Sequence, residues 1–343
     1  METKRNLPND GSAASVRPTP EVKFDILIPT YNRPRLLDIA LRNAFSIALP
    51  QCRIVVIDDG SEISQELDDG TTLDTAGVVE RHEDSRLVYH RFDRNRGLGA
   101  VFETYLAELL NGEDLMIVGD DDVLIDGAPI QKGLDLLDSE SKLSAVMFPI
   151  RQKDHLGENR LIELNYTRMN GHQFLHRYVD DDPIKHVAMY GLFRTEDIYR
   201  SGGFQSMGLR EKYGLDDAFG IDTDFLFRIA TVGGFDFIQE PHLRRQDIGG
   251  ITERFPVSFA YCYYQYVLRA LKILRRKDFM ERRYQQKFVR QWLKIMLMSY
   301  SSSLHMANSE ERGSERIRKH LKYPIHLYIL LQLMRFHIWL DKD

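Results

Sequence analysis

Cysteine is scarce in this sequence of 343 residues. Only Cys52 and Cys262 occur, far apart and without the spacing of a metal-binding motif. Two isolated cysteines supply neither a disulfide framework nor a zinc site, and this scarcity indicates a reducing compartment. We therefore expect a cytoplasmic protein.

Long apolar runs are also missing. No uninterrupted stretch reaches the roughly 18 residues that a membrane-spanning helix needs. The nearest candidate, residues 323–340, is interrupted by polar side chains such as Arg335, and we interpret it as a buried or interfacial helix. No apolar run follows Lys4 and Arg5, so the sequence predicts no secretory signal.

The net charge of −5 is unevenly distributed. Residues 265–343 hold 17 Lys and Arg against 7 Asp and Glu, a balance of +10, which leaves −15 for residues 1–264. In a nucleic-acid-binding protein the basic patch would line the working groove, so we expect no nucleic-acid partner. The distribution favours a cation-dependent site beside a surface that meets anionic lipid.

Strand and helix patterns alternate in the first half, which predicts an α/β fold with a doubly wound, mostly parallel sheet. The predicted strands are residues 24–29, 53–57, 87–92, 114–118, 144–150 and 186–193. The predicted helices are residues 35–48, 98–110 and 222–232. Residues 62–85 are predicted to be an acidic connection. Residues 1–21, rich in Pro, Ser, Asn and Thr, are predicted to be a disordered lead-in.

The tail, residues 256–343, is predicted to be a helical region. In residues 263–277 and again in residues 287–296, basic and apolar side chains take opposite faces. One interpretation is a set of helices packed on the preceding domain with a solvated basic face. The other is peripheral contact with the inner face of the cell membrane, where a lipid-linked acceptor would lie.

Three consecutive carboxylates, Asp120 to Asp122, directly follow the fourth predicted strand. Ligands bind at the carboxyl ends of the strands in open α/β sheets. Adjacent ionised carboxylates repel one another unless a cation lies among them, and Mg²⁺ or Mn²⁺ suits such oxygen ligands. The alternative is a solvated acidic turn. Asp58 and Asp59 end the second strand in the same way, where a carboxylate can accept hydrogen bonds from a nucleotide.

Five motifs, in order over residues 24–254, resemble those of the inverting family-2 glycosyltransferases with the GT-A fold. They are Ile28-Pro29-Thr30-Tyr31-Asn32-Arg33 with Val56-Ile57-Asp58-Asp59-Gly60-Ser61; Asn95-Arg96-Gly97-Leu98-Gly99; Gly119-Asp120-Asp121-Asp122; Gly202-Gly203-Phe204 after Gly191-Leu192-Phe193-Arg194; and Asp222-Thr223-Asp224-Phe225-Leu226-Phe227-Arg228. The third stands where that family has its DXD metal motif. The resemblance implies a glycosyltransferase domain over residues 22–255.

The resemblance also implies a role for each matching residue. Asp222 would be the general base that deprotonates an acceptor hydroxyl. Two of the three aspartates, Asp122 with Asp120 or Asp121, would bind Mn²⁺ or Mg²⁺ against the diphosphate. The residues implied at the donor nucleotide are Pro29, Thr30, Tyr31, Arg33, Asp58, Asp59, Arg96, Asp120 and Asp121. The donor would be a nucleoside diphosphate sugar, with UDP expected. The acceptor would be a hydroxyl of a glycan or lipid-linked glycan in bacterial surface polysaccharide assembly.

The sequence departs from the family pattern at three places. Ile221 stands where an acidic residue usually precedes the catalytic aspartate, and Gly119 stands where the metal motif often begins. Asp247 takes the place of a late histidine, so it becomes a candidate metal ligand, with His242 as the alternative. These departures leave open a non-catalytic binding or scaffold subunit. A sugar-nucleotide nucleotidyltransferase is disfavoured, because the segment after the first strand is not Gly-rich.

Overall fold

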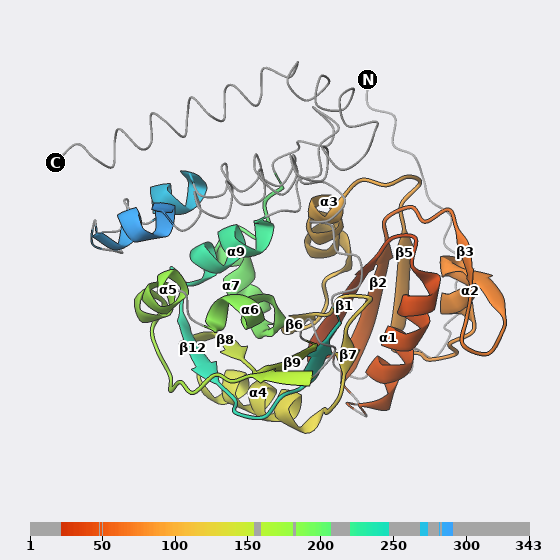
Figure 1. Cartoon of the computed structure of the whole chain (residues 1–343), viewed down its shortest axis with the longest axis horizontal. Coiled ribbons are helices and arrows are strands. Elements are labelled where there is room, and N and C mark those ends of the chain that lie inside the picture. Colours follow the sequence, from red (N-terminus) through yellow and green to blue (C-terminus); the bar gives the residue numbers. More distant parts are fainter. Residues whose placement is uncertain are drawn as a thin grey trace, which may run out of the picture.

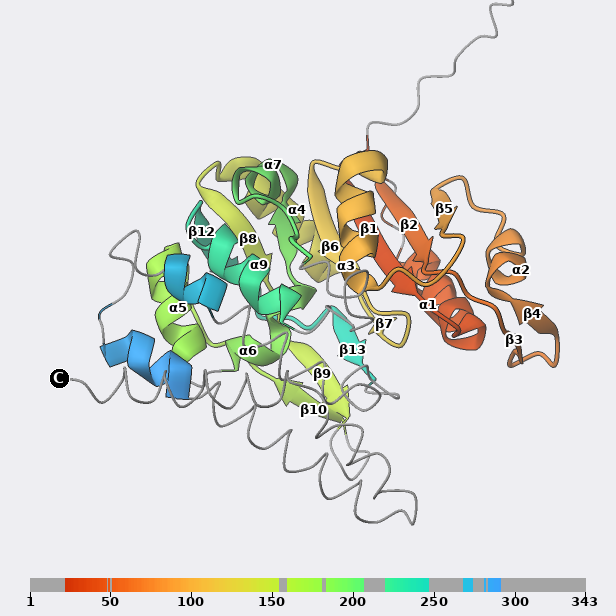
Figure 2. The same cartoon turned by 90° about the horizontal axis from the view of Figure 1, so that it is seen from above.

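A computed structural model describes residues 22–47, 49, 51–153, 159–180, 183–206, 220–246, 268–273, 281 and 283–290. These residues form a seven-stranded sheet, a four-stranded sheet and a two-stranded sheet, with helices around them (Figures 1 and 2). Within this part of the chain, no helix is both long and apolar enough to cross a membrane.

The seven-stranded sheet has the order β12-β8-β11-β6-β1-β2-β5. Its strands are β1 (Phe24–Thr30), β2 (Cys52–Asp58), β5 (Leu87–Arg91), β6 (Asp114–Ile117), β8 (Leu143–Met147), β11 (Leu192–Arg194) and β12 (Gly234–Phe237). The central strand β1 pairs in parallel with β2 and β6, and its Ile26, Leu27 and Ile28 are fully buried. Such continuous apolar runs suit strands that are covered on both faces. The predicted mostly parallel α/β fold is therefore confirmed, with β11 running antiparallel to both of its neighbours.

The helices connect and cover these strands. They are α1 (Pro34–Ser46), α2 (Thr75–Glu80), α3 (Leu98–Thr104), which continues as a π-helix (Tyr105–Leu109), α4 (Ala128–Ser139), α5 (Gly171–Val179), α6 (Ile184–Val187), a 3₁₀ helix (Ala188–Tyr190), α7 (Thr195–Arg200) and α9 (Ile221–Ile229). Helix α4 lies against β8 and β11, while α1 lies against α2 and β7. Helix α1 begins with Pro34, whose fixed φ and missing N–H suit a first helical position.

A second sheet extends from the edge that carries the aspartates. It has the order β10-β9-β13-β7, with β7 (Val123–Leu124), β9 (Ile150–Lys153), β10 (Asn159–Ile162) and β13 (Leu243–Arg245). Because β13 pairs antiparallel with β7, Leu243 lies opposite Leu124 and Arg244 opposite Val123. This register brings the residues after β13 toward the residues before β7. The two-stranded sheet is the hairpin of β3 (Ser64–Glu66) and β4 (Thr72–Asp74).

Three predicted segments differ from the structure. The predicted strand 186–193 is wrong over most of its length, because α6 and the 3₁₀ helix bury Ile184 and Val187 and only the end at Leu192 is a strand. The predicted strand 144–150 is two strands, β8 and β9, which belong to different sheets. Residues 62–85 are not a plain connection, since they contain β3, β4 and α2.

Two segments of the predicted C-terminal helical region are described, residues 268–273 and 283–290, and both are helical. Ala270, Leu271, Phe288 and Val289 are buried, and the Phe288 ring lies 4.9 Å from that of Phe227, which α9 carries. Lys272, Lys287 and Arg290 are exposed. In these segments the helices thus pack on the domain with a solvated basic face. Most of the tail lies outside the described residues, so its membrane contact stays a prediction.

Candidate active site

The predicted site residues gather at one edge of the large sheet. Thr30 ends β1, Asp58 ends β2, and Asp120 follows β6 by three residues. Because these three neighbouring strands are parallel, their carboxyl ends meet at the same edge. The structure therefore brings the strand-end carboxylates to one edge of the sheet, and their roles stay predictions.

Asp120 is held by two side chains from the segment that ends β1. The hydroxyl of Thr30 donates to its Oδ2 at 2.8 Å, and Nη1 of Arg33 donates to its Oδ1 at 3.0 Å. The same Nη1 reaches Oδ2 of Asp121 at 3.1 Å, so one guanidinium bridges two carboxylates. Burial nevertheless raises the pKa of Asp120 to about 6, because only 6% of the residue is exposed.

Asp122 is also buried, and the backbone holds it at both oxygens. The N–H of Gly119 donates to Oδ2 at 3.2 Å, and the N–H of Gln246 donates to Oδ1 at 3.3 Å. Burial, followed by the nearby charge of Asp121, raises the pKa of Asp122 to about 7. A carboxylate kept from water beside another carboxylate suits a cation, and oxygen donors suit Mg²⁺ or Mn²⁺.

Among the described residues, no group of three or more His, Cys, Asp and Glu side chains is arranged to hold a metal ion. Asp247, the third predicted metal ligand, lies outside the residues that the structure describes. Gln246, which directly precedes it, is bonded to Asp122. Divalent cations of this type are bound by only one or two protein carboxylates when a diphosphate supplies further oxygens. Asp120 and Asp122 therefore fit this kind of site.

His242, the alternative ligand to Asp247, has a different environment. Its ring is fully buried against Phe148 at 4.5 Å between ring centroids, and burial lowers its pKa to about 3. Its backbone carbonyl accepts from Ile125, so it lies at the end of the β7–β13 pair that is remote from Asp122. This position argues against His242 as a ligand beside Asp122.

Asp59 and Asp58 make contacts within the protein. Asp59 accepts the backbone N–H groups of Arg96 (2.5 Å) and Gly97 (2.9 Å), and so ties β2 to the start of α3. Asp58 is fully buried, and its two oxygens accept the N–H of Ser61 and the hydroxyl of Tyr89 at 2.8 and 2.9 Å. Both carboxylates thus order the loops at the sheet edge. Their nucleotide-binding roles stay predictions.

The loop after β1 is fixed by its neighbour after β2. Asn32 has a left-handed backbone (φ 54°), its N–H donates to Oγ of Ser61, and its side chain accepts from Glu62. Gly60 has φ +73°, and a Cβ at this position would lie 2.4 Å from the carbonyl carbon of Arg94. The loop that carries Pro29, Thr30 and Tyr31 is therefore pre-ordered. The guanidinium of Arg96, a further predicted donor residue, stacks over Phe92 at 4.5 Å.

Asp222, the predicted general base, lies in the first turn of α9. It is partly exposed, and its Oδ1 accepts the N–H of Thr223 at 2.7 Å. Burial raises the pKa of Asp222, while the positive charge of Arg245 lowers it. The positive charge of Arg245 also lowers the pKa of Asp122, and β13, which ends at Arg245, pairs with β7, which begins directly after Asp122. Arg245 is therefore a further candidate residue beside Asp122.

Asp224, two residues further, is a structural residue. It is fully buried and pairs with Nε of Arg228 at 3.0 Å, and Nη1 of Arg269 lies 3.9 Å from the same oxygen. Arg269 also donates to the carbonyl of Gln205 at 3.0 Å. The C-terminal segment 268–273 is therefore attached to the helix that carries Asp222.

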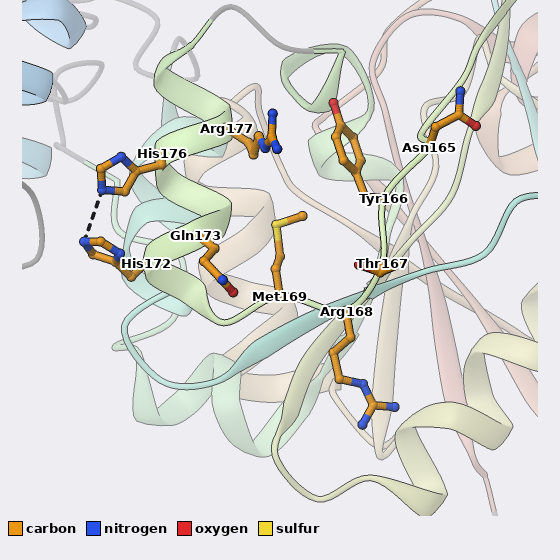
Figure 3. A pocket seen from close by; sticks show the side chains of 9 residues that line it. All are labelled: Asn165, Tyr166, Thr167, Arg168, Met169, His172, Gln173, His176 and Arg177. Carbon is orange, nitrogen blue, oxygen red and sulfur yellow. Dashed lines mark hydrogen bonds between the residues drawn. The ribbon is translucent and has the colours of Figure 1, made fainter.

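Two cavities of about 530 and 640 Å³ lie elsewhere, and no strand-end aspartate lines either of them. The smaller one is formed by residues 165–169 and α5 (Figure 3).

Comparisons with known proteins give one family. The model of glycosyl transferase family 2 matches residues 25–200, just over half of the chain. No curated protein matches the sequence.

Several solved structures have a similar fold. A structure of S. aureus TarS 1–349 in complex with UDP-GlcNAc is 15% identical with a TM-score of 0.58, over 79% of this chain and 71% of that one. A mannosyltransferase from Pyrobaculum calidifontis, PcManGT in complex with GDP-Man and Mn²⁺, is 16% identical with a TM-score of 0.50, over 96% and 91% of the two chains. At these identities the likeness shows the fold.

Proposed function

The chain belongs to glycosyl transferase family 2, and we propose that it transfers a sugar from a nucleoside diphosphate sugar to an acceptor hydroxyl with inversion at the anomeric carbon. Its fold is the GT-A fold of glycosyltransferases. The observation that supports the proposal is the pair of buried carboxylates Asp120 and Asp122, which follow β6 at the sheet edge where β1 and β2 also end and whose pKa values burial raises to about 6 and about 7.

The donor in this proposal lies along the ends of β1, β2 and β6. Tyr31 supplies a stacking face for the base, and Asp59 and Asp58 bind the base and ribose. Arg33 and Arg96 supply positive charge near the diphosphate, while Asp120 with Asp122 and Asp247 would hold Mn²⁺ or Mg²⁺. Such an ion would stabilise the negative charge on the departing diphosphate. UDP is the proposed nucleotide, in keeping with the UDP-GlcNAc complex of the similar TarS structure.

Asp222 acts as the general base in this scheme. Its carboxylate takes the proton of the acceptor hydroxyl while the hydroxyl oxygen attacks the anomeric carbon. The bond from that carbon to the diphosphate oxygen breaks on the opposite face, so the configuration inverts. Burial raises the pKa of Asp222 and so makes it a stronger base. The proposed acceptor is a glycan or lipid-linked glycan of bacterial surface polysaccharide, and the proposed location is the cytoplasm, with the basic tail at the inner membrane face.

The donor site is tested by measuring melting temperatures with UDP, GDP, UDP-GlcNAc and GDP-Man, each with and without Mn²⁺. A ligand at 100 times its dissociation constant stabilises the fold by ~2.7 kcal/mol. We expect this stabilisation from UDP and UDP-GlcNAc with Mn²⁺ in the wild type and not in Asp122→Asn. Asp135→Asn, at an exposed position of α4, is the matched control that should respond like the wild type. If no nucleotide raises the melting temperature under any metal condition, the proposed donor site is refuted. If nucleotides bind in a metal-dependent way but no donor hydrolysis or transfer is detected, a scaffold subunit is favoured.

A further inference from the structure

Helix α5 presents two histidines one turn apart on its surface. His172 is exposed, His176 is half-buried, and their Nε2 atoms lie 3.1 Å apart. Figure 3 shows the two rings directed toward each other from the same side of the helix. Residues four positions apart share one helix face, and two such histidines can bind one metal ion.

The spacing of the two nitrogens suits a single ion between them. Zinc–nitrogen bonds are about 2.0–2.1 Å long, so two imidazole nitrogens on one ion lie about 2.9 Å apart at a right angle and about 3.4 Å apart at the tetrahedral angle. The observed 3.1 Å falls between these values. Both Nε2 atoms can act as ligands when each ring takes the tautomer that is protonated at Nδ1.

The helix that carries the pair is well anchored. Asn170 and Gln173 form a capping box at its start, with backbone-to-side-chain distances of 2.9 and 3.0 Å. The helix also buries Phe174, Leu175, Tyr178 and Val179. The Tyr284 ring packs edge-on against His176 with 4.2 Å between centroids, which limits the motion of that imidazole. A ligand pair on such an element loses little conformational entropy on binding.

The electrostatics also favour a neutral imidazole at His176. Partial burial, and then the charge of the neighbouring His172, lowers the pKa of His176. The other groups that act on His176 are Asp180 and Glu281, which raise this pKa, and Arg283, which lowers it. Metal ions bind the neutral form of histidine.

We propose that His172 and His176 form a chelating site for a late transition-metal ion, Zn²⁺ or Cu²⁺, distinct from the aspartate site for Mn²⁺ or Mg²⁺. Imidazole favours zinc and copper, whereas carboxylate oxygens suit magnesium and manganese. Among the described residues no third metal-binding side chain completes the group, and water can supply further ligands to the ion. Both rings line the cavity of about 530 Å³, which gives an ion and its water ligands access to them.

The test is isothermal titration calorimetry of the full, untagged chain with ZnCl₂ in a non-chelating buffer at pH 7.5. We compare the wild type, His172→Gln and His176→Gln. Each substitution should weaken zinc binding at this site by at least about tenfold. Removing a residue that only hydrogen-bonds to a metal ligand already weakens binding by that much, and these substitutions remove a ligand itself. His90→Gln, which removes a histidine elsewhere, should bind zinc as the wild type does. Substitution of the exposed His172 leaves the core of α5 intact, so a folding defect does not obscure the result.

Electron paramagnetic resonance of bound Cu²⁺ gives an independent measurement. The wild-type spectrum should contain a species with two nitrogen ligands that is absent from both variants. Zinc affinity should also fall as the pH is lowered to values at which histidine becomes protonated, because only the neutral imidazole binds the ion. Wild-type zinc affinity in His172→Gln, or loss of binding in only one of the two variants, would overturn the proposal and leave the pair as an ordinary hydrogen bond. Binding of Mn²⁺ with UDP should be the same in all of these variants.

Discussion

Asp114 offers a prediction in which stability depends on pH. It begins β6 at the opposite edge of the sheet from the active site and is 3% exposed, and its Oδ1 has no hydrogen-bond partner. Burial raises its pKa from 3.8 to about 7. Because the pKa is higher in the folded state, this carboxyl stabilises the fold below pH ~4, and that stabilisation is lost as the pH rises to about 7.

The magnitude follows from the size of the shift. A difference of about 3 pKa units corresponds to ~4 kcal/mol between pH 4 and pH 7. Asp114→Asn removes the buried charge but introduces amide N–H groups without partners, which costs ~1–2 kcal/mol. The variant should therefore exceed the wild type in the free energy of unfolding by about 2–3 kcal/mol at pH 8, and should lose this advantage at pH 4.

The assay is urea unfolding of both proteins at each pH from 4 to 8, with nucleotide-dependent melting shifts as a check on the distant site. The difference in unfolding free energy should change by ~1.4 kcal/mol per pH unit between pH 4 and 7 and then level off. A difference that does not change with pH, or a variant that is less stable than the wild type at pH 8, would refute the assigned cost of burying this charge. Donor binding should be unchanged.

Three more changes test the site and its supports. Asp222→Asn should lower the rate of sugar transfer by about 10²–10⁴-fold while the dissociation constant of the donor nucleotide stays the same, and a wild-type transfer rate would exclude it as the base. Arg33→Ala should reduce the free energy of unfolding without metal by about 2 kcal/mol, because it removes charged hydrogen bonds to two aspartates. In that variant Mn²⁺ should raise the melting temperature more than in the wild type, and an equal rise would contradict this account. Gly171→Ala should lower the free energy of unfolding measured in urea by at least ~1–3 kcal/mol, because a Cβ at position 171 would lie 1.6 Å from the carbonyl oxygen of Ala230. An unchanged free energy of unfolding would mean that the backbone shifts easily at this contact.

The sheet was predictable where the sequence signal is local. Strands β1, β2, β5 and β6 were located within a residue or two because each is a short apolar run bounded by polar or turn residues. The two strands in segment 143–153 were not separated, since β9 differs from β8 only by pairing with β10 and the distant β13 in another sheet. Helix α5 was missed although Asn170 and Gln173 have the spacing of a capping box, a signal that was present in the sequence.

The same distinction applies to the candidate site. Asp120, Asp122 and Asp222 stand out in sequence because carboxylates directly follow a strand or begin a helix. Their burial, which raises their pKa values, and the hydrogen bond from Gln246 to Asp122 could not be predicted, because both depend on tertiary pairing such as that of β13 with β7. Nor does a sequence reveal that Asp59 is bonded to the backbone of residues 96 and 97.

The attachment of Arg269 to Asp224 bears on how this protein can diverge or be recombined. Asp224 has no exposed surface and lies two positions from the proposed base, and among the described residues one of its cationic neighbours, Arg269, lies more than forty residues later in the chain. Exchanging the C-terminal part with that of a relative would keep every residue of the proposed site and still alter the charge balance beneath it. We therefore expect hybrids that join the two parts from different relatives to be more active when position 269 holds a basic residue than when it does not.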